Sequence, residues 1–176
     1  NRYLAVAESP LIELAQKYEN IQVLKRIPDS VKPGVNPQSI TFAHYLDVPS
    51  DYIFVFNPCL PMLTIDTVRQ AFDYFQSTNY LSYTSSVETH DWVFDNNGKA
   101  LTNKNPANLT TNKGESYFKA AHAFHIVNKK NLKKTGQHWT FSKNDPHLIT
   151  ISKEETIDVD DVLDFKFAEY YYLNKK

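Results

Sequence analysis

Residues 51–56 (DYIFVF) limit the choice of fold more than any other part of the sequence. They form an apolar run of strand length without the polar alternation of a half-exposed strand, which is typical of a strand covered on both faces. A turn with two prolines follows, and residues 65–76 then carry four apolar side chains at helical spacing. A buried strand followed by an amphipathic helix predicts one unit of an α/β sheet.

The rest of the chain repeats this order. Apolar runs predict strands at 3–7, 21–24, 51–56, 80–86, 116–127 and 147–151, and helical spacing predicts helices at 10–18, 38–46, 65–76 and 161–173. We therefore expect one domain over 1–176, a three-layer α/β fold with a mainly parallel sheet. Residues 95–98 (DNNG) predict the turn of a hairpin over 92–101, and the polar, non-periodic residues 102–115 predict a loop or an extended arm.

Composition excludes several classes of protein. The formal net charge is −1 and no long basic run is present, so we expect no nucleic-acid partner. No apolar run of about 18 residues occurs, so we expect no membrane span. Cys59 is the single cysteine and cannot form an internal disulfide, which favours a reducing, cytoplasmic location.

Two acids, Asp158 and Asp160, follow a short apolar segment late in the chain. Two residues apart on an extended backbone, they point to the same side, with Cα atoms about 6.5–7 Å apart. Such a pair suits Mg²⁺, which takes one or two carboxylates and keeps several waters. Asp161 and Asp164 lie at a predicted helix start, where carboxylates stabilise the helix dipole. All four acids could serve that purpose, and this alternative stays open.

The end of the apolar strand is a second candidate. Asn57 and Pro58 directly follow residues 51–56, and ligands of α/β sheets bind beyond the carboxyl ends of strands. The alternative is a turn stiffened by proline. Arg26 ends the predicted strand 21–24 and is a candidate for binding phosphate or carboxylate, or else a solvated turn residue. His122 and His125 lie in a predicted strand, where they would face opposite sides, so we do not expect them to share a metal.

The order of these segments resembles that of the acylneuraminate cytidylyltransferases, the CMP-sialic acid synthetases. Residues 51–68 (DYIFVFNPCLPMLTIDTV) are similar to that family's hydrophobic strand, proline loop and helix, and residues 156–164 (TIDVDDVLD) to its acidic signature. Residues 117–127 lie where the family has an Asn-Gly-Ala segment, with Ala121 and His122 at the Asn-Gly positions. The resemblance implies a nucleotide-diphospho-sugar-transferase-like fold.

The resemblance also implies a function. It predicts Mg²⁺-dependent transfer of CMP from CTP to a sialic-acid-like sugar acid for surface polysaccharide synthesis, with Asp158 and Asp160 as the catalytic metal ligands. Asn57, Pro58, Arg26 and His122 would contact substrate. Residues 88–118 would form a protruding β-hairpin arm that joins two copies in a homodimer. The family's first strand and Gly-rich phosphate loop are not in this sequence. We therefore expect either that they lie upstream of Asn1 or that the chain is an inactive homologue acting as a binding or interaction domain.

Overall fold

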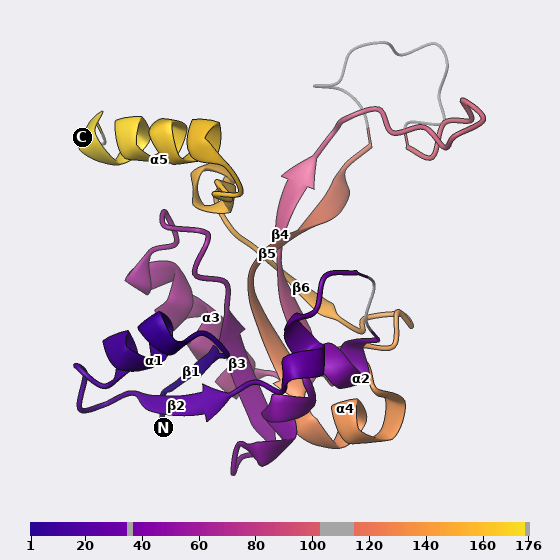
Figure 1. The fold of residues 1–176 in the computed structure, drawn as a ribbon. Coiled ribbons are helices and arrows are strands. Elements are labelled where there is room, and N and C mark those ends of the chain that lie inside the picture. The colour runs from indigo at the N-terminus through magenta and orange to yellow at the C-terminus, as the bar shows by residue number, and fades with distance from the viewer. Residues whose placement is uncertain (35–36, 103–114, 175–176) are drawn as a thin grey trace.

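The computed structural model describes residues 1–34, 37–102 and 115–174. Figure 1 shows their elements in the predicted order of strands and helices. The strands are β1 Tyr3–Val6, β2 Gln22–Lys25, β3 Tyr52–Phe56, β4 Tyr83–Thr89, β5 Tyr117–Asn128 and β6 His147–Thr150. The helices are α1 Ser9–Ala15, α2 Gln38–Thr41, α3 Ile65–Ser77, α4 Lys129–Thr135 and α5 Val162–Asn174, with short 3-10 turns η1 Pro28–Val31, η2 Ala43–Asp47 and η4 Lys153–Thr156.

The sheet is mixed, so the prediction of a mainly parallel sheet was wrong. The larger sheet has the order β3-β5-β4-β6, and β5 runs antiparallel to both β3 and β4. Only β6 lies parallel to β4, while β1 and β2 form a separate parallel pair. β5 follows β4 in the chain and pairs with it directly, so the two strands form an antiparallel pair.

Both faces of β3 make apolar contacts, although its side chains stay partly exposed and Phe56 is exposed. Phe54 lies 5.8 Å and 5.6 Å, centroid to centroid, from Phe72 and Phe75 of α3. On the opposite face, Ile53 and Val55 pack against a buried cluster of Tyr45, Val127 and Leu132. This arrangement gives the predicted three layers of helix, sheet and helix. Among the described strands, however, β3 is an edge strand, because it pairs only with β5.

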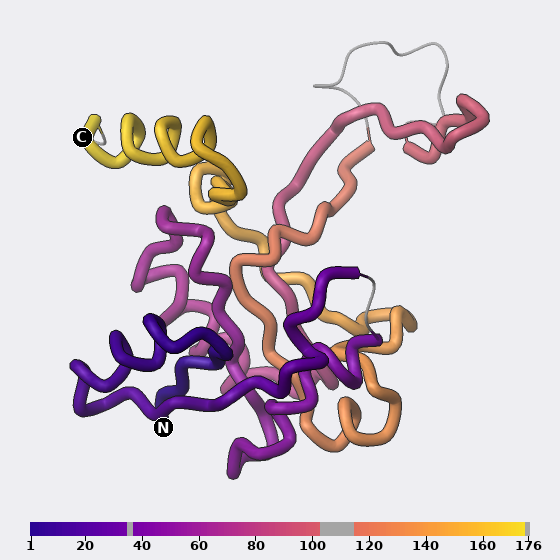
Figure 2. Tube along the Cα trace, in the orientation of Figure 1, coloured from indigo at the N-terminus to yellow at the C-terminus, as the bar shows by residue number. Residues whose placement is uncertain are grey.

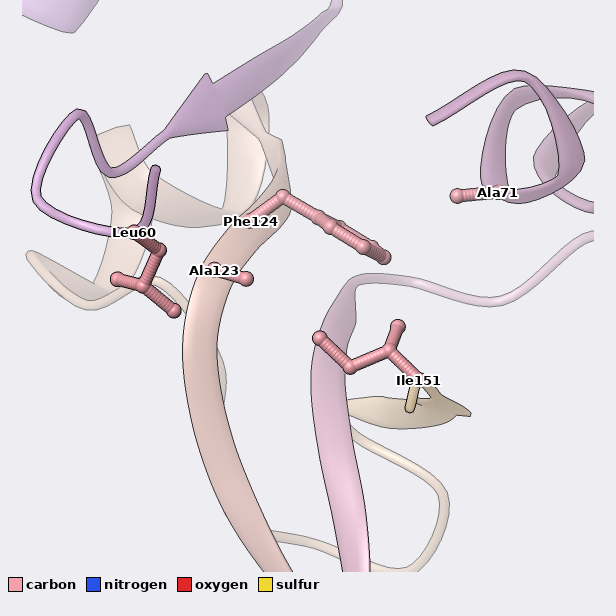
Figure 3. Close-up of a cluster of buried hydrophobic side chains, with 5 residues drawn as sticks. All are labelled: Leu60, Ala71, Ala123, Phe124 and Ile151. Carbon is pink, nitrogen blue, oxygen red and sulfur yellow. The ribbon is translucent and has the colours of Figure 1, made fainter. Parts of the chain in front are cut away.

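A second buried cluster fixes the turn after β3 against the rest of the sheet. It contains Leu60, Ala71, Ala123, Phe124 and Ile151, which come from that turn, α3, β5 and the end of β6. Figure 3 shows these five side chains gathered around β5. Burying them removes apolar surface from water, the main favourable term in folding. The turn after β3 is therefore fixed against α3, β5 and the residue that follows β6.

β4 and β5 extend beyond the other strands, and Figure 1 shows their paired ends projecting from the body. The register runs from Ser86↔Ala120 to Thr89↔Tyr117. The predicted turn after this pair is present, with Gly98 at φ 78° and a single bridge between Phe94 and Ala100. Part of the predicted arm, 103–114, lies outside the described residues.

The helix predicted over 38–46 is interrupted. α2 ends at Thr41, and Phe42 adopts φ −114°, outside the helical range, before η2 begins. Phe42 packs against Tyr45 and His138, with ring centroids 5.3 Å and 4.1 Å away. Aromatic packing thus accompanies the interruption, a tertiary contact that helical periodicity cannot predict.

Candidate functional site

Three segments that are far apart in the sequence meet at the end of β3. The backbone N–H of Asn57 donates to the carbonyl of Ala123 at 3.0 Å, which ties the turn to β5. The backbone N–H of Val159 donates to the carbonyl of Cys59 at 2.9 Å. Val159 separates Asp158 from Asp160, so this bond holds the acidic pair beside the turn that contains Asn57 and Pro58.

The four acids divide into two groups. The Asp161 carboxylate accepts the backbone N–H groups of Leu163 and Asp164, at 2.7 and 3.0 Å, and so caps the first turn of α5. Asp164 accepts the N–H groups of Asp160 and Asp161 at 3.1 and 3.2 Å. For Asp161 and Asp164 the helix-start interpretation is therefore correct.

Asp158 does not share that role. Its Oδ1 atom is buried and has no hydrogen-bond partner among the described residues. A buried carboxylate oxygen without a partner loses its hydration and gains nothing in return, so such atoms call for an explanation. Asp160, one residue beyond Val159, is exposed to solvent.

Asp158 and Asp160 are the two residues here that could hold a divalent cation. Asp158 presents an unpartnered oxygen and Asp160 an accessible carboxylate, the hard ligands that Mg²⁺ prefers. Within the described ranges no group of three or more His, Cys, Asp or Glu side chains could hold a metal. Two carboxylates are enough for Mg²⁺ when water and substrate phosphates supply the remaining oxygens.

The Asn57 side chain has a structural role in its own turn. Its Oδ1 accepts the backbone N–H of Cys59 at 3.0 Å, an Asx turn. This bond leaves the Nδ2 group as the part of the amide that can donate to a ligand. The turn interpretation and the ligand interpretation of Asn57 are therefore compatible.

A cavity of about 830 Å³ lies between β1 and β3. Its lining includes Leu4 and Ala5 of β1, Ile53 and Val55 of β3, and both Arg26 and Pro58. Its volume lies within the range of small-molecule sites, about 300–1,000 Å³. The structure thus brings two of the predicted substrate-binding residues, Arg26 and Pro58, to one cavity.

Arg26 is partly committed to the fold. One guanidinium nitrogen donates to the carbonyl of Ser30 at 2.8 Å, while Nε is buried without a partner. His44 lines the same cavity. Burial and then the positive charge of Arg26 lower the pKa of His44 to about 4, although Asp47 opposes them. His44 is therefore neutral near pH 7, while Arg26 and Arg2, which also lines the cavity, carry positive charge there.

His122 and His125 lie on the same side of β5, so the prediction that they face apart was wrong. The β4–β5 register shifts between Thr84 and Ser86, and His122 adopts φ 56°, in the left-handed region. This bulge cancels the strand alternation. His122 Nδ1 and His125 Nε2 come within 3.4 Å of each other. His122 is adjacent in sequence to Ala123, whose carbonyl accepts the Asn57 N–H, but its ring contacts His125 and does not line the cavity that contains Arg26 and Pro58.

His125 is held in a neutral state. Its Nδ1 lies 2.8 Å from the Thr84 hydroxyl, and its ring lies 5.7 Å from that of His138. Burial, followed by the charges of His138 and His122, lowers the pKa of His125 to about 3. Sequence patterns did not single out His125 or His138 for this role, because their burial arises from the bulge and from the loop after α4.

Glu155 is a residue of the site region that the sequence interpretation missed. Its buried carboxylate accepts hydrogen bonds from the Thr64 backbone, the Thr64 hydroxyl and the Thr67 hydroxyl, at 2.9, 2.7 and 3.0 Å. Burial raises the pKa of Glu155, but the hydrogen bonds from Thr64, Thr67 and Ser152 together lower it below its ordinary value. The spacing of Ser152 and Glu155, a capping box, was the signal available in the sequence.

Comparison with known proteins supports the fold. No protein-family model and no curated protein matches the chain. Among solved structures, the chain is similar to the 4-diphosphocytidyl-2C-methyl-D-erythritol synthase from Anaerococcus prevotii, with a TM-score of 0.64. The two share 11% identity over 97% of this chain and 80% of that chain. At this identity the likeness shows a common α/β fold, not a common reaction. No helix in the described parts of the chain is long and apolar enough to cross a membrane.

Proposed function

We propose that the chain is a cytidylyltransferase that transfers CMP from CTP to a sialic-acid-like sugar acid with the help of Mg²⁺. The observation that carries the proposal is the hydrogen bond from Val159 to Cys59, because it holds the acidic pair at the end of β3. The named function of the solved structure, a diphosphocytidyl sugar-alcohol synthase, supports a CTP-dependent reaction. The sugar acid rests on the sequence resemblance.

Each residue has a role in this proposal. A hydroxyl oxygen of the sugar acid attacks the α-phosphorus of CTP, a new P–O bond forms, the bond to the β-phosphate breaks with release of pyrophosphate, and the hydroxyl proton passes to water. Asp158 and Asp160 would hold Mg²⁺, which would neutralise charge on the phosphates. Asn57 Nδ2 and the exposed His122 orient the substrate, and Arg26 binds an anionic group. Pro58 shapes the cavity wall.

Positioning and charge neutralisation provide most of the catalysis in phosphoryl transfer, so no strong nucleophile is required on the protein. Cys59 is exposed and needs no catalytic role here. The proposal also includes a homodimer formed through the 88–118 arm, a cytoplasmic location, and surface polysaccharide synthesis as the context.

The test is release of pyrophosphate from CTP in the presence of Mg²⁺ and a panel of nine-carbon and eight-carbon sugar acids. We expect release with at least one of them, and a loss of about a hundredfold or more in Asp158→Asn/Asp160→Asn. Asp161→Asn is the matched control, since asparagine also caps helices and should preserve both α5 and turnover. Release that survives the double substitution would exclude the metal role of the pair.

A second candidate is a non-catalytic homologue that acts as a binding domain. It is favoured by the fact that two candidate site groups already make hydrogen bonds within the chain. Asn57 Oδ1 accepts from the Cys59 N–H, and the guanidinium of Arg26 donates to the Ser30 carbonyl. Isothermal titration with CTP and Mg²⁺ separates the two. Binding without pyrophosphate release from any sugar acid supports the second candidate.

A further inference from the structure

His122 and His125 face each other on β5, and the proposed reaction does not explain why they do. Their ring centroids lie 5.4 Å apart, and Nδ1 of His122 lies 3.4 Å from Nε2 of His125. His122 is exposed, whereas His125 is partly buried. A regular strand would separate the two side chains, so a particular backbone conformation brings them together.

Ser85 of β4 holds that conformation. Its buried Oγ accepts the backbone N–H groups of Ala123 and Phe124, at 2.9 and 3.1 Å, and donates to the Phe124 carbonyl at 3.2 Å. A β-bulge bends its strand, and Figure 2 shows a sharp bend in the trace of β5. His122 adopts φ 56°, a left-handed conformation that is uncommon for residues other than glycine. Backbone strain of this kind is typical of functional sites.

Thr84 fixes the orientation of the second ring. Its buried hydroxyl lies 2.8 Å from His125 Nδ1 and 3.4 Å from the Ser85 carbonyl. A hydroxyl that donates to this carbonyl accepts the Nδ1–H of His125, which leaves the lone pair of Nε2 facing His122. Histidines that bind metals usually have such an outer partner on their second ring nitrogen.

The spacing of the two facing nitrogens matches that of two ligands of one metal ion. Nitrogens that each lie about 2.0–2.1 Å from a tetrahedral Zn²⁺ are about 3.3–3.4 Å from each other. Hydrogen bonds from N–H groups are usually shorter, about 2.7–3.2 Å. We infer that His122 Nδ1 and His125 Nε2 bind one Zn²⁺ ion.

The ligands favour zinc over the magnesium of the proposed reaction. Imidazole nitrogens suit Zn²⁺, whereas Mg²⁺ takes oxygen ligands such as those of Asp158 and Asp160. Among the residues that the structure describes, no group of three or more His, Cys, Asp or Glu side chains could hold a metal, so the histidine pair is separate from the two acids. Water or an external ligand would complete the coordination of zinc. Nε2 of His122 stays available for contact with substrate.

Isothermal titration with ZnCl₂ in the presence of excess Mg²⁺ tests the pair. We expect one Zn²⁺ to bind per chain. Glycine adopts the left-handed backbone without steric cost, so His122→Gly should remain folded while zinc affinity falls by about a hundredfold or more. His90→Gln removes a histidine outside the pair and should leave the affinity unchanged. Asp158→Asn/Asp160→Asn should also keep zinc binding, although it should abolish the proposed transfer.

Thr84 is tested as a positioning residue. Thr84→Val keeps the shape of the side chain but loses the hydroxyl, so zinc affinity should fall about tenfold. Thr84→Ser keeps the hydroxyl and should bind zinc like the unmodified chain. Circular dichroism checks that both variants are folded. A purely structural role of Thr84 would change the stability of the protein and not its zinc affinity.

A crystal soaked in Zn²⁺ locates the ion by anomalous scattering at the zinc edge. A peak about 2.0–2.1 Å from both nitrogens, lost in His122→Gly, supports the inference. Three results would overturn it: no saturable zinc binding, zinc affinity that His122→Gly leaves unchanged, or a zinc peak only at Asp158 and Asp160.

Discussion

The Glu155 carboxylate accepts hydrogen bonds from the hydroxyl and the backbone N–H of Thr64, at 2.7 and 2.9 Å. The two residues are 91 positions apart in the sequence. Thr64 is the N-cap of α3, and its own side chain accepts the backbone N–H of Thr67. Glu155 lies three residues before Asp158. The bond therefore anchors the acidic segment to the helix that follows the β3 turn, and the candidate site depends on it.

Removal of this anchor should destabilise the protein. Glu155→Ala removes the carboxylate that accepts from the partly buried Thr64 and Thr67, at a cost of about 1–2 kcal/mol in the free energy of unfolding. Urea unfolding measures the change. Glu154→Ala is the control, because Glu154 is exposed. An equal, small effect of both substitutions would show that Glu155 anchors nothing.

Protonation of Glu155 at low pH should weaken its hydrogen bonds to Thr64 and Thr67. The folded-state pKa of Glu155 lies below its ordinary value of 4.5, so the ionised form stabilises the fold. Its contribution is complete above about pH 4.5 and is lost as the pH falls through the lowered pKa. Glu155→Gln should therefore flatten the pH dependence of unfolding below about pH 4.5. An unchanged profile in that window would contradict this assignment.

Three histidines should make the fold acid-sensitive at a higher pH. The pKa values of His44, His125 and His138 fall to about 4, 3 and 4, mainly through burial. Below about pH 6.5 these histidines bind protons in the unfolded chain but stay neutral in the folded chain. The free energy of unfolding therefore falls as the pH is lowered. The loss is on the order of 2 kcal/mol per histidine by pH 5.

His138→Phe isolates one of these protons. Phenylalanine keeps an aromatic ring against Phe42, whose centroid lies 4.1 Å from His138, but does not titrate. Between pH 5 and 6 the slope of unfolding free energy against pH should decrease by about one proton. A slope equal to that of the unmodified chain would mean that His138 is not held neutral.

Arg26 should contribute to nucleotide binding. It lines the 830 Å³ cavity with Pro58, and its buried Nε has no partner. Arg26→Gln removes the positive charge, and we expect CTP affinity to fall about tenfold, as for the loss of one charge-assisted hydrogen bond. Isothermal titration measures the affinity. Arg69→Gln, whose arginine pairs with Asp66 on the exposed surface of α3, is the control. Equal affinity for all three proteins would place the nucleotide elsewhere.

The local pattern of the sequence predicted the elements well and their pairing less well. Apolar runs and caps located each strand and each longer helix, because periodicity and capping are properties of neighbouring residues. The direction of β5 depends on how the chain returns from β4, and the edge position of β3 depends on which strands pair. The pattern of neighbouring residues predicts neither of these two properties.

The candidate site shows the same division. Asn57 and Pro58 could be singled out from sequence because they directly follow β3, whereas Asp158 and Asp160 follow the 3-10 turn η4, which the sequence did not predict. Asp161 and Asp164 had the expected helix-start signal. The meeting of His122 with His125 depends on a bulge, and the role of Glu155 depends on a contact with Thr64, so both required coordinates.

The central claim is that Asp158 and Asp160 hold a divalent cation beside Asn57 and Pro58. Its most direct test is a crystal soaked with CTP and Mn²⁺, examined for anomalous scattering. The account predicts a Mn²⁺ peak about 2.0–2.3 Å from carboxylate oxygens of Asp158 and Asp160, with nucleotide phosphates completing its coordination. Ordered CTP without metal at this pair, or a Mn²⁺ peak elsewhere, would contradict it.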